Sequence, residues 1–180
     1  MNILVTGGLG YLGSHAAVKL IQQNYGVVIL DNLSNSHKKN LKRIEKITCK
    51  KIKFYKEDIR HKSSLRKIFK DNNIEGIMHF AGLKSVKKSI SHRKEYFDVN
   101  VNGTRNLRNV LNEIDCDEKL FIFSSSACVY GNPDYLPYNE THALNPENFY
   151  GETKLQSEQI LEETYKNNKS IKPNRKKSKN

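Results

Sequence analysis

The chain has 180 residues, of which 37% are hydrophobic and 28% are charged, a balance that predicts one folded domain with a charged surface. It contains no apolar run long enough to cross a bilayer, and its first residues lack the basic-then-apolar pattern of a signal peptide. We therefore expect a cytoplasmic protein without a membrane partner. The formal net charge of +12 is concentrated at the C-terminus, where residues 166–180 hold seven basic and no acidic side chains.

Strand and helix patterns alternate along the sequence. Short apolar strands are expected at residues 3–6, 27–30, 51–55, 76–80 and 120–124, and helices at residues 11–23, 38–47, 62–70, 96–114 and 150–165. The first helix is expected to carry Leu12, Ala16 and Leu20 on one face. Strands separated by helices of this length predict an α/β fold, a doubly wound parallel sheet with helices on both faces.

The segment that follows the last expected helix contains no further apolar strand, because Ile171 is the only large aliphatic residue after Leu161. The fifth strand would then be an uncovered apolar edge. We expect a domain of residues 1–165 followed by a basic tail of residues 166–180, which is too poor in apolar residues to order itself. Nucleic-acid binding by this tail is the less favoured alternative, because no aromatic residue follows Tyr165 to stack on bases.

The cysteines and histidines give no sign of a metal site or a disulfide framework. Cys49, Cys116 and Cys128 share no close spacing, and the six histidines are equally scattered. Cys128 is a candidate nucleophile, but no histidine lies near it in the sequence, so a small packing residue is the favoured interpretation. We expect no metal.

A glycine loop follows the first expected strand and opens the first helix, with glycines at positions 7, 10 and 13. Gly7 would permit the tight turn, Gly10 the approach of a pyrophosphate to the backbone, and Gly13 the close packing of helix and strand. The pyrophosphate would lie on free N–H groups at the positive end of the helix. By itself this spacing is equally compatible with a structural turn.

Two acidic residues strengthen the dinucleotide interpretation. Asp31 ends the second expected strand, 18 residues after Gly13, where its carboxylate can bind ribose hydroxyls and repel a 2′-phosphate. This favours NAD over NADP and predicts a Rossmann-like sheet with strand order 3-2-1-4-5. Asp58, just after the third strand, could meet the adenine, although a surface acid is the better interpretation of that residue alone.

A candidate reactive trio consists of Ser126, Tyr150 and Lys154. A free tyrosine has a pKa near ~10, and an ammonium group one helical turn away would favour the phenolate. Ser126 follows the fifth strand, at the sheet edge where ligands bind in such folds, and could bond the reacting oxygen. A tyrosine and a lysine at this spacing are common by chance, but together with the glycine loop they predict oxidoreduction of a hydroxyl.

Five segments of the chain form a recognisable set: GGLGYLGSH at residues 7–15, DNLSNS at 31–36, HFAGLK at 79–84, NVNGT at 100–104 and FSSSACVYG at 123–131. Together they resemble the UDP-glucose 4-epimerase family, which belongs to the extended short-chain dehydrogenase/reductases, the NAD-dependent epimerases and dehydratases. The resemblance extends over about residues 1–165. It implies an isomerase of nucleotide-sugar and galactose metabolism that holds NAD tightly.

The resemblance also implies roles for individual residues. Ser126, Tyr150 and Lys154 would be catalytic, and Ser126 and Tyr150 would contact the substrate. The expected cofactor-binding residues are Gly7, Gly10, Tyr11, Leu12, Gly13, Asp31, Asn32, Leu33, Ser34, Asn35, Ser36, Asp58, Ile59, Phe80, Ala81, Gly82, Leu83, Lys84, Asn100, Tyr150 and Lys154.

The implied reaction interconverts UDP-glucose and UDP-galactose. Tyr150 would take the proton of the sugar 4-hydroxyl while NAD takes the hydride from C4, and the hydride would return to the other face of the keto sugar. Related dehydratases are expected to have an Asp-Glu pair where this chain has Ala127 and Cys128, which can neither donate nor accept the protons that elimination of water requires. The resemblance therefore implies epimerisation.

The chain departs from the family pattern in two places. Lys87-Lys88 is more basic than expected, and residues 172–180 resemble none of the C-terminal substrate domain that the family has. We expect a truncated chain that lacks this domain and has reduced epimerase activity on UDP-hexoses. The alternatives are a non-catalytic NAD-binding protein and, less favoured, a basic nucleic-acid-binding protein. The resemblance also allows the chain to form a homodimer.

Overall fold

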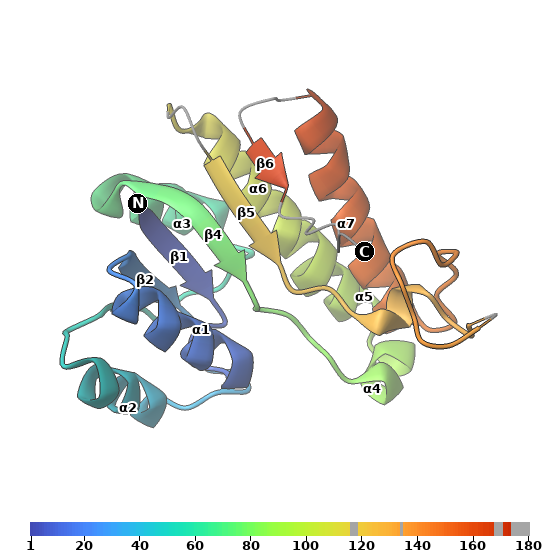
Figure 1. Cartoon of the computed structure of the whole chain (residues 1–180), viewed down its shortest axis with the longest axis horizontal. Helices are drawn as coiled ribbons and strands as arrows, with labels where there is room; N and C mark the ends of the chain where they lie inside the picture. The colour runs from blue at the N-terminus through green and yellow to red at the C-terminus, as the bar shows by residue number, and fades with distance from the viewer. Residues whose placement is uncertain (116–118, 134, 168–170, 174–180) are drawn as a thin grey trace.

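The computed structural model describes residues 1–115, 119–133, 135–167 and 171–173 (Figure 1). Its centre is a parallel sheet with strand order β3-β2-β1-β4-β5-β6. The strands are β1 (Asn2–Thr6), β2 (Gly26–Leu30), β3 (Lys53–Tyr55), β4 (Ile74–His79), β5 (Lys119–Phe123) and β6 (Ile171–Pro173). The doubly wound α/β fold and the order 3-2-1-4-5 of the first five strands are thus confirmed.

Helices cover both faces of the sheet. They are α1 (Tyr11–Gln22), α2 (Lys39–Thr48), α3 (Lys62–Asn72), α4 (Val86–Ser91), α5 (Arg93–Tyr96), α6 (Gly103–Glu113) and α7 (Phe149–Asn167), with a π-helix η1 (Phe97–Asn102) between α5 and α6 and a 3₁₀ turn η2 (Ala127–Val129). The expected helix at residues 96–114 is therefore an α–π–α stretch, and α4 is an element that the sequence pattern did not predict.

Two apolar clusters hold the layers together. One lies between the sheet and helices α3 and α6, where Leu65, Phe69 and Leu107 pack against Ile77 of β4. The other lies on the opposite face, where Ala17 and Ile21 of α1 and Ile44 of α2 pack against Ile29 of β2. Burial of these side chains supplies the main driving force for the fold.

The buried face of α1 differs from the expected one. Gly13, Ala17 and Ile21 are buried, whereas Leu12 is 57% exposed, so the predicted Leu12, Ala16 and Leu20 face was wrong. The reason is Gly13: a Cβ there would overlap the Gly7 carbonyl oxygen and the Gly8 Cα. Because only glycine allows this approach, Gly13 determines which side of the helix lies against the glycine loop.

The sixth strand corrects the expectation of an uncovered fifth strand. Residues 171–173 pair in parallel with β5, Lys119 opposite Ile171 and Phe121 opposite Pro173. Pairing of this kind uses backbone N–H and C=O groups, so it does not require the apolar pattern on which the expectation was based. The end of α7 and β6 also lie beyond the domain boundary expected at residue 165; of the expected tail, residues 168–170 and 174–180 lie outside the described residues.

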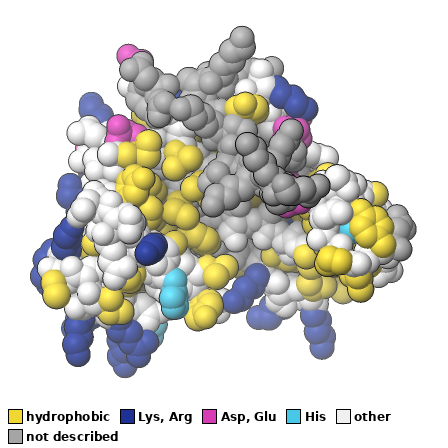
Figure 2. Space-filling view, in the orientation of Figure 1, with side chains coloured by type: hydrophobic (Ala, Val, Ile, Leu, Met, Phe, Trp, Pro, Cys, Tyr) yellow, Lys and Arg dark blue, Asp and Glu magenta, His cyan; other side chains and the backbone are white. Residues whose placement is uncertain are grey.

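The loop between η2 and α7 packs around its own aromatic side chains. Tyr130 and Tyr138 stack with ring centroids 5.5 Å apart, and His142 lies 4.0 Å from the ring of Tyr135. Figure 2 shows hydrophobic side chains gathered over this loop at the right-hand end of the molecule. Tyr135 and Leu136 of the loop are exposed. The loop therefore has a local core beside the start of α7.

The central position of β4 predicts that truncating its buried side chains lowers the free energy of unfolding. Ile77 is fully buried between the β1 and β5 neighbours of its strand, so Ile77→Ala should lower the free energy of unfolding by about 2–5 kcal/mol. Ile47→Ala, at a side chain that is 62% exposed, is the matched control and should change it by less than about 0.5 kcal/mol. Urea denaturation followed by circular dichroism measures both, and equal losses would contradict the assigned core.

Candidate functional site

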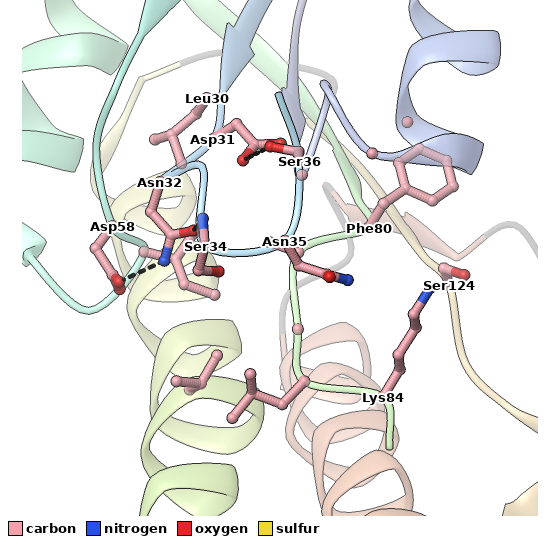
Figure 3. A pocket seen from close by; sticks show the side chains of 18 of the residues that line it. Leu30, Asp31, Asn32, Ser34, Asn35, Ser36, Asp58, Phe80, Lys84 and Ser124 are labelled. Carbon is pink, nitrogen blue, oxygen red and sulfur yellow. Dashed lines mark hydrogen bonds between the residues drawn. The ribbon is translucent and has the colours of Figure 1, made fainter. Parts of the chain in front are cut away.

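A cavity of about 440 Å³ lies at the carboxyl ends of β1 to β5 (Figure 3). The loops after five parallel strands meet here, at the place where the strand order reverses between β1 and β4. Its wall consists of Gly7, Gly10, Tyr11, Leu12, Gly13, Leu30, Asp31, Asn32, Ser34, Asn35, Ser36, Glu57, Asp58, Ile59, Arg60, Phe80, Ala81, Gly82, Leu83, Lys84, Glu95, Val99 and Ser124.

Most of the expected cofactor-binding residues lie in this wall. Leu33, Asn100, Tyr150 and Lys154 are the expected residues that do not line it. The sequence prediction missed six wall residues: Leu30, Glu57, Arg60, Glu95, Val99 and Ser124. Leu30, Glu57, Arg60 and Ser124 are near neighbours of predicted loop residues, so extending each motif to the whole loop would have found them. Glu95 and Val99 come from α5 and η1, which no local motif connects to the cavity.

The glycine loop is built for close backbone contact. Gly7 has a φ of +64°, and a Cβ on it would lie 2.7 Å from the Ala81 backbone nitrogen, so glycine lets the loops after β1 and β4 touch. A Cβ on Gly10 would meet only the Gly7 carbonyl oxygen, at 3.2 Å, which leaves its other side open. Gly10 cannot cap α1 with a side chain. The N–H groups of the first turn of α1 are therefore suited to bind an anion.

Asp31 is buried beside this loop and organises it. One carboxylate oxygen accepts a hydrogen bond from the Leu9 backbone N–H at 3.0 Å. The other accepts from the Leu33 N–H at 2.9 Å and from the Ser36 hydroxyl at 2.7 Å (Figure 3). Only the Ser36 bond comes from a side chain that can rotate away. A ligand hydroxyl could replace it without disturbing the two backbone contacts.

Asp58 is only 9% exposed, so it is not a surface acid. The Arg60 side chain donates to both of its oxygens, at 2.9 and 3.0 Å, and Asn32 donates to one of them at 2.9 Å. Burial opposes the ionised form, but the hydrogen bonds from Arg60 and Asn32 prevail and hold the pKa of Asp58 well below its usual range. Arg60 also reaches Asp98 of η1, at 3.4 Å. At this end of the cavity, Asp58 is therefore an ionised carboxylate paired with the Arg60 guanidinium.

The trio does not line the cavity, although Ser126 follows the wall residue Ser124 by two positions. Tyr150 is in the first turn of α7, Lys154 lies one turn later, and Ser126 precedes η2. Burial raises the pKa of Tyr150, and the Ser126 hydroxyl opposes this shift. The fold thus brings Ser126 near the Tyr150 phenol although the two residues are 24 positions apart in the sequence.

Lys154 is buried rather than directed into solvent. It is 9% exposed, and its Nζ lies 4.2 Å from the centre of the Phe123 ring. Burial lowers the pKa of Lys154 to about 8, with Glu158 acting in the opposite direction. Lys154 is not among the groups that shift the pKa of Tyr150, which is raised. The expectation that this ammonium lowers the pKa of the phenol was therefore wrong for this structure.

Asn100 connects the cavity to α7. Its side-chain oxygen accepts from the Leu83 N–H at 2.8 Å, and its amide nitrogen donates to the Leu83 carbonyl and to the Thr153 hydroxyl, both at 3.0 Å. The Thr153 hydroxyl in turn donates to the Tyr150 carbonyl at 2.7 Å. Asn100 thus lies behind the wall, where it fixes Leu83 relative to the helix that carries Tyr150 and Lys154.

A buried chain of hydrogen bonds fixes the protonation of His79. The Thr104 hydroxyl donates to the Asn100 carbonyl at 2.6 Å, so it must accept from Nε2 of His79 at 2.9 Å. Nδ1 then accepts from the Thr6 hydroxyl, at 2.7 Å. Burial, together with the charge of Lys154, lowers the pKa of His79 to about 3. His79 is therefore neutral, with its proton on Nε2, beside the buried ammonium of Lys154.

The described residues contain neither a candidate metal cluster nor a candidate membrane span. No group of three or more histidine, cysteine, aspartate or glutamate side chains in that part of the chain is placed to hold a metal ion. No helix within the described ranges combines the length and the apolar character needed to span a membrane.

Comparison with known proteins identifies the family. Residues 4–174 match the family model described as GDP-mannose 4,6 dehydratase. The UDP-glucose 4-epimerase of Bacillus subtilis is 43% identical over 165 residues, which are 92% of this chain and 48% of that protein. The chain spans about half the length of the curated relatives that it matches.

Two solved structures are similar in fold and sequence. The UDP-glucose 4-epimerase of Bifidobacterium longum in complex with NAD⁺ and UDP superposes with a TM-score of 0.90 at 38% identity, over 95% of this chain and 51% of that one. The enzyme of Stenotrophomonas maltophila, with bound NAD and formylated UDP-arabinopyranose, has a TM-score of 0.88 at 42% identity, over 93% and 49% of the two chains.

The charge state of His79 can be tested by NMR. Because its pKa is lowered to about 3, it should stay neutral with a proton on Nε2 alone from about pH 7.5 to pH 5, whereas a histidine in water titrates near ~6.5. Its contribution to stability is complete above about pH 6.5 and declines as the pH falls toward the folded pKa. Nitrogen-15 imidazole spectra, with His79→Gln to assign the signal, measure this. A ring that gains its second proton near pH 6.5 would contradict the assigned hydrogen-bond chain.

Proposed function

The chain belongs to the family described as GDP-mannose 4,6 dehydratase, and from this membership and the geometry of the site we propose that it forms the NAD-binding and hydride-transfer part of a UDP-glucose 4-epimerase. The observation that carries the proposal is a cavity with a glycine-built anion cradle whose wall residue Leu83 is tied through Asn100 and Thr153 to the helix turn of Tyr150. The similar curated proteins are epimerases. Ala127 and Cys128, which follow Ser126, cannot supply the acid and base for elimination of water.

The cavity fits a dinucleotide in size and in the chemistry of its wall. The first turn of α1 would hold the pyrophosphate, because its N–H groups are open beside Gly10. Asp31 would bind the ribose hydroxyls in place of Ser36, and its charge disfavours a 2′-phosphate. Asn32 and Asp58 would lie at the adenine end, and Phe80 to Lys84 at the nicotinamide end. Two similar structures, from Bifidobacterium longum and Stenotrophomonas maltophila, hold NAD.

In the proposed mechanism the residues of the chain move a proton. NAD, when bound, would supply the hydride chemistry at C4 of the sugar. The Tyr150 phenolate takes the proton of the 4-hydroxyl, and Ser126 donates a hydrogen bond to the reacting oxygen. In the return step Tyr150 would give the proton back to the oxygen at C4. The proton is thus restored, and only the configuration at C4 changes.

Burial sets the charge of the groups around Tyr150. Lys154 has a pKa near 8, so at neutral pH most of the population carries a charge one helical turn from Tyr150. Burial raises the pKa of the phenol and the Ser126 hydroxyl opposes this shift, so Ser126 is the group that favours the phenolate in this structure. Neutral His79 avoids a second positive charge that would compete with protonation of Lys154.

A non-catalytic NAD-binding protein is the second candidate. One observation favours it: Ser126, Tyr150 and Lys154 do not line the cavity. The two candidates predict the same NAD affinity, and they differ in whether Tyr150 matters for a reaction.

Cofactor binding gives the first test of the proposal. The purified chain should bind NAD at least about 10-fold more tightly than NADP, and Asp31→Asn should weaken NAD binding by about 10- to 100-fold because a charged hydrogen-bond acceptor is lost. Asp71→Asn, on the exposed surface of α3, is the control and should bind NAD as the parent does. Calorimetric titration measures the affinities. Equal binding of NAD and NADP by the parent would contradict the assigned role of Asp31.

Turnover of UDP-galactose gives the second test. Tyr150→Phe should lower the rate by about 10²- to 10⁴-fold, because it removes the group that exchanges the proton. Tyr165→Phe changes a 40% exposed tyrosine on the same helix and should have no effect. We also propose that the 180-residue chain is slower than a full-length relative, since it spans about half of such proteins and binding of remote substrate groups contributes to the rate. NAD binding without any effect of Tyr150→Phe on UDP-galactose conversion would favour the second candidate.

A further inference from the structure

Ser89 connects helix α4 to the residue proposed as the general base. Its side chain is fully buried, and its hydroxyl donates a hydrogen bond to the Val86 carbonyl at 2.6 Å. The same oxygen accepts a bond from the backbone N–H of Tyr150 at 3.2 Å. The two residues are 61 positions apart, so this contact exists only in the folded chain.

The Tyr150 N–H needs such a partner because of its position in α7. The first N–H groups of a helix have no acceptor within the helix. The Asn148 side chain, which lies directly before α7, accepts from the Gly151 N–H at 2.9 Å. Ser89 satisfies the neighbouring Tyr150 N–H from a different helix. The Asn148 cap comes from the chain directly before α7, so it does not fix α7 relative to another helix. The Ser89 bond does, because Ser89 belongs to α4.

Further contacts hold the same turn from two sides. Arg93 of α5 lies 4.1 Å from the centre of the Phe149 ring and 3.6 Å from a carboxylate oxygen of Glu152. On the other side, a Cβ on Gly151 would crowd the Cys128 carbonyl oxygen, so glycine lets η2 approach the turn. The Cys128 N–H donates to the Ser126 hydroxyl oxygen at 3.2 Å. The turn with Tyr150 is thus held between the α4–α5 segment and the turn that orients Ser126.

We infer that Ser89 is a positioning residue that holds the main chain of Tyr150 and thereby sets the position of the phenol relative to Ser126. The segment that includes Ser89 begins with the cavity wall at Phe80 to Lys84, and the Tyr96 hydroxyl closes it by donating to the Ser85 carbonyl at 2.8 Å. One stretch of chain therefore both lines the cavity and sets the position of the phenol. This inference rests on the proposed function for its catalytic meaning, but the geometry that it asserts is independent of turnover.

The test compares Ser89→Ala with Ser91→Ala. Both changes remove a hydroxyl from α4, but Ser91 is exposed and, among the described residues, its hydroxyl bonds to Lys88 and His92 of its own segment. Tyrosine labelled with carbon-13 at Cζ reports the environment and ionisation of each phenol, and Tyr150→Phe identifies the Tyr150 signal. Ser89→Ala should move this signal and change its pKa, because the position of the phenol relative to Ser126 is disturbed. Ser91→Ala should leave both unchanged.

Kinetics give the second readout. Ser89→Ala should lower kcat by about 3- to 10-fold, the loss expected when a helix cap that orients a reacting group is removed, with KM and the NAD affinity unchanged. A merely structural serine would lower the urea midpoint without moving the Tyr150 signal or kcat, and that result would overturn the inference. If the parent neither binds NAD nor converts UDP-galactose, the proposed function fails, and the NMR comparison still decides whether Ser89 positions the phenol.

Discussion

The amide of Asn100 joins the two halves of the candidate site. Buried behind the cavity wall, it bonds both main-chain groups of Leu83 and the hydroxyl of Thr153. A buried primary amide left without partners costs more than its bonds contribute when they are made, so this arrangement holds only when the wall and α7 are in register. The π-helix that contains Asn100 widens the turn at this point. The cavity and the trio therefore share one rigid frame.

The electrostatics of the site follow from burial combined with directed hydrogen bonds. At one end, Asp58 stays ionised because Arg60 and Asn32 donate to it. At the other, Lys154 has a lowered pKa because it is buried against Phe123, and His79 is kept neutral by a chain of hydroxyl and carbonyl partners. The site thus has the ionised Asp58 at one end and, at the other, Lys154, which can lose its proton near neutral pH. This arrangement suits a ligand with a charged middle and a reactive end.

Local patterns in the sequence were sufficient for the sheet, whereas most of the cavity wall was implied by the family resemblance. The alternation of apolar strands and helices predicted five strands, since buried parallel strands are short apolar runs between helices, and the glycine fingerprint with Asp31 predicted their order. The glycine spacing and Asp31 located the cradle, because backbone crowding at Gly7 and Gly13 allows no other residue. The sixth strand was not predicted, because it pairs through backbone groups and has no apolar sequence pattern. The buried face of α1 was predicted wrongly, because the close contact of Gly13, and not a leucine, determines how that helix packs.

The sequence by itself determined the fold class, the cradle and the identity of Ser126, Tyr150 and Lys154 as candidates, because glycine conformation and residue chemistry are local properties. Only the tertiary structure decided how these candidates are held. The Ser89 contact with Tyr150, the Asn100 bonds to Leu83 and Thr153, and the burial of Lys154 each join segments that are distant in the chain. Desolvation and hydrogen-bond geometry depend on such neighbours, so pKa values and orientation follow from packing rather than from spacing along the sequence.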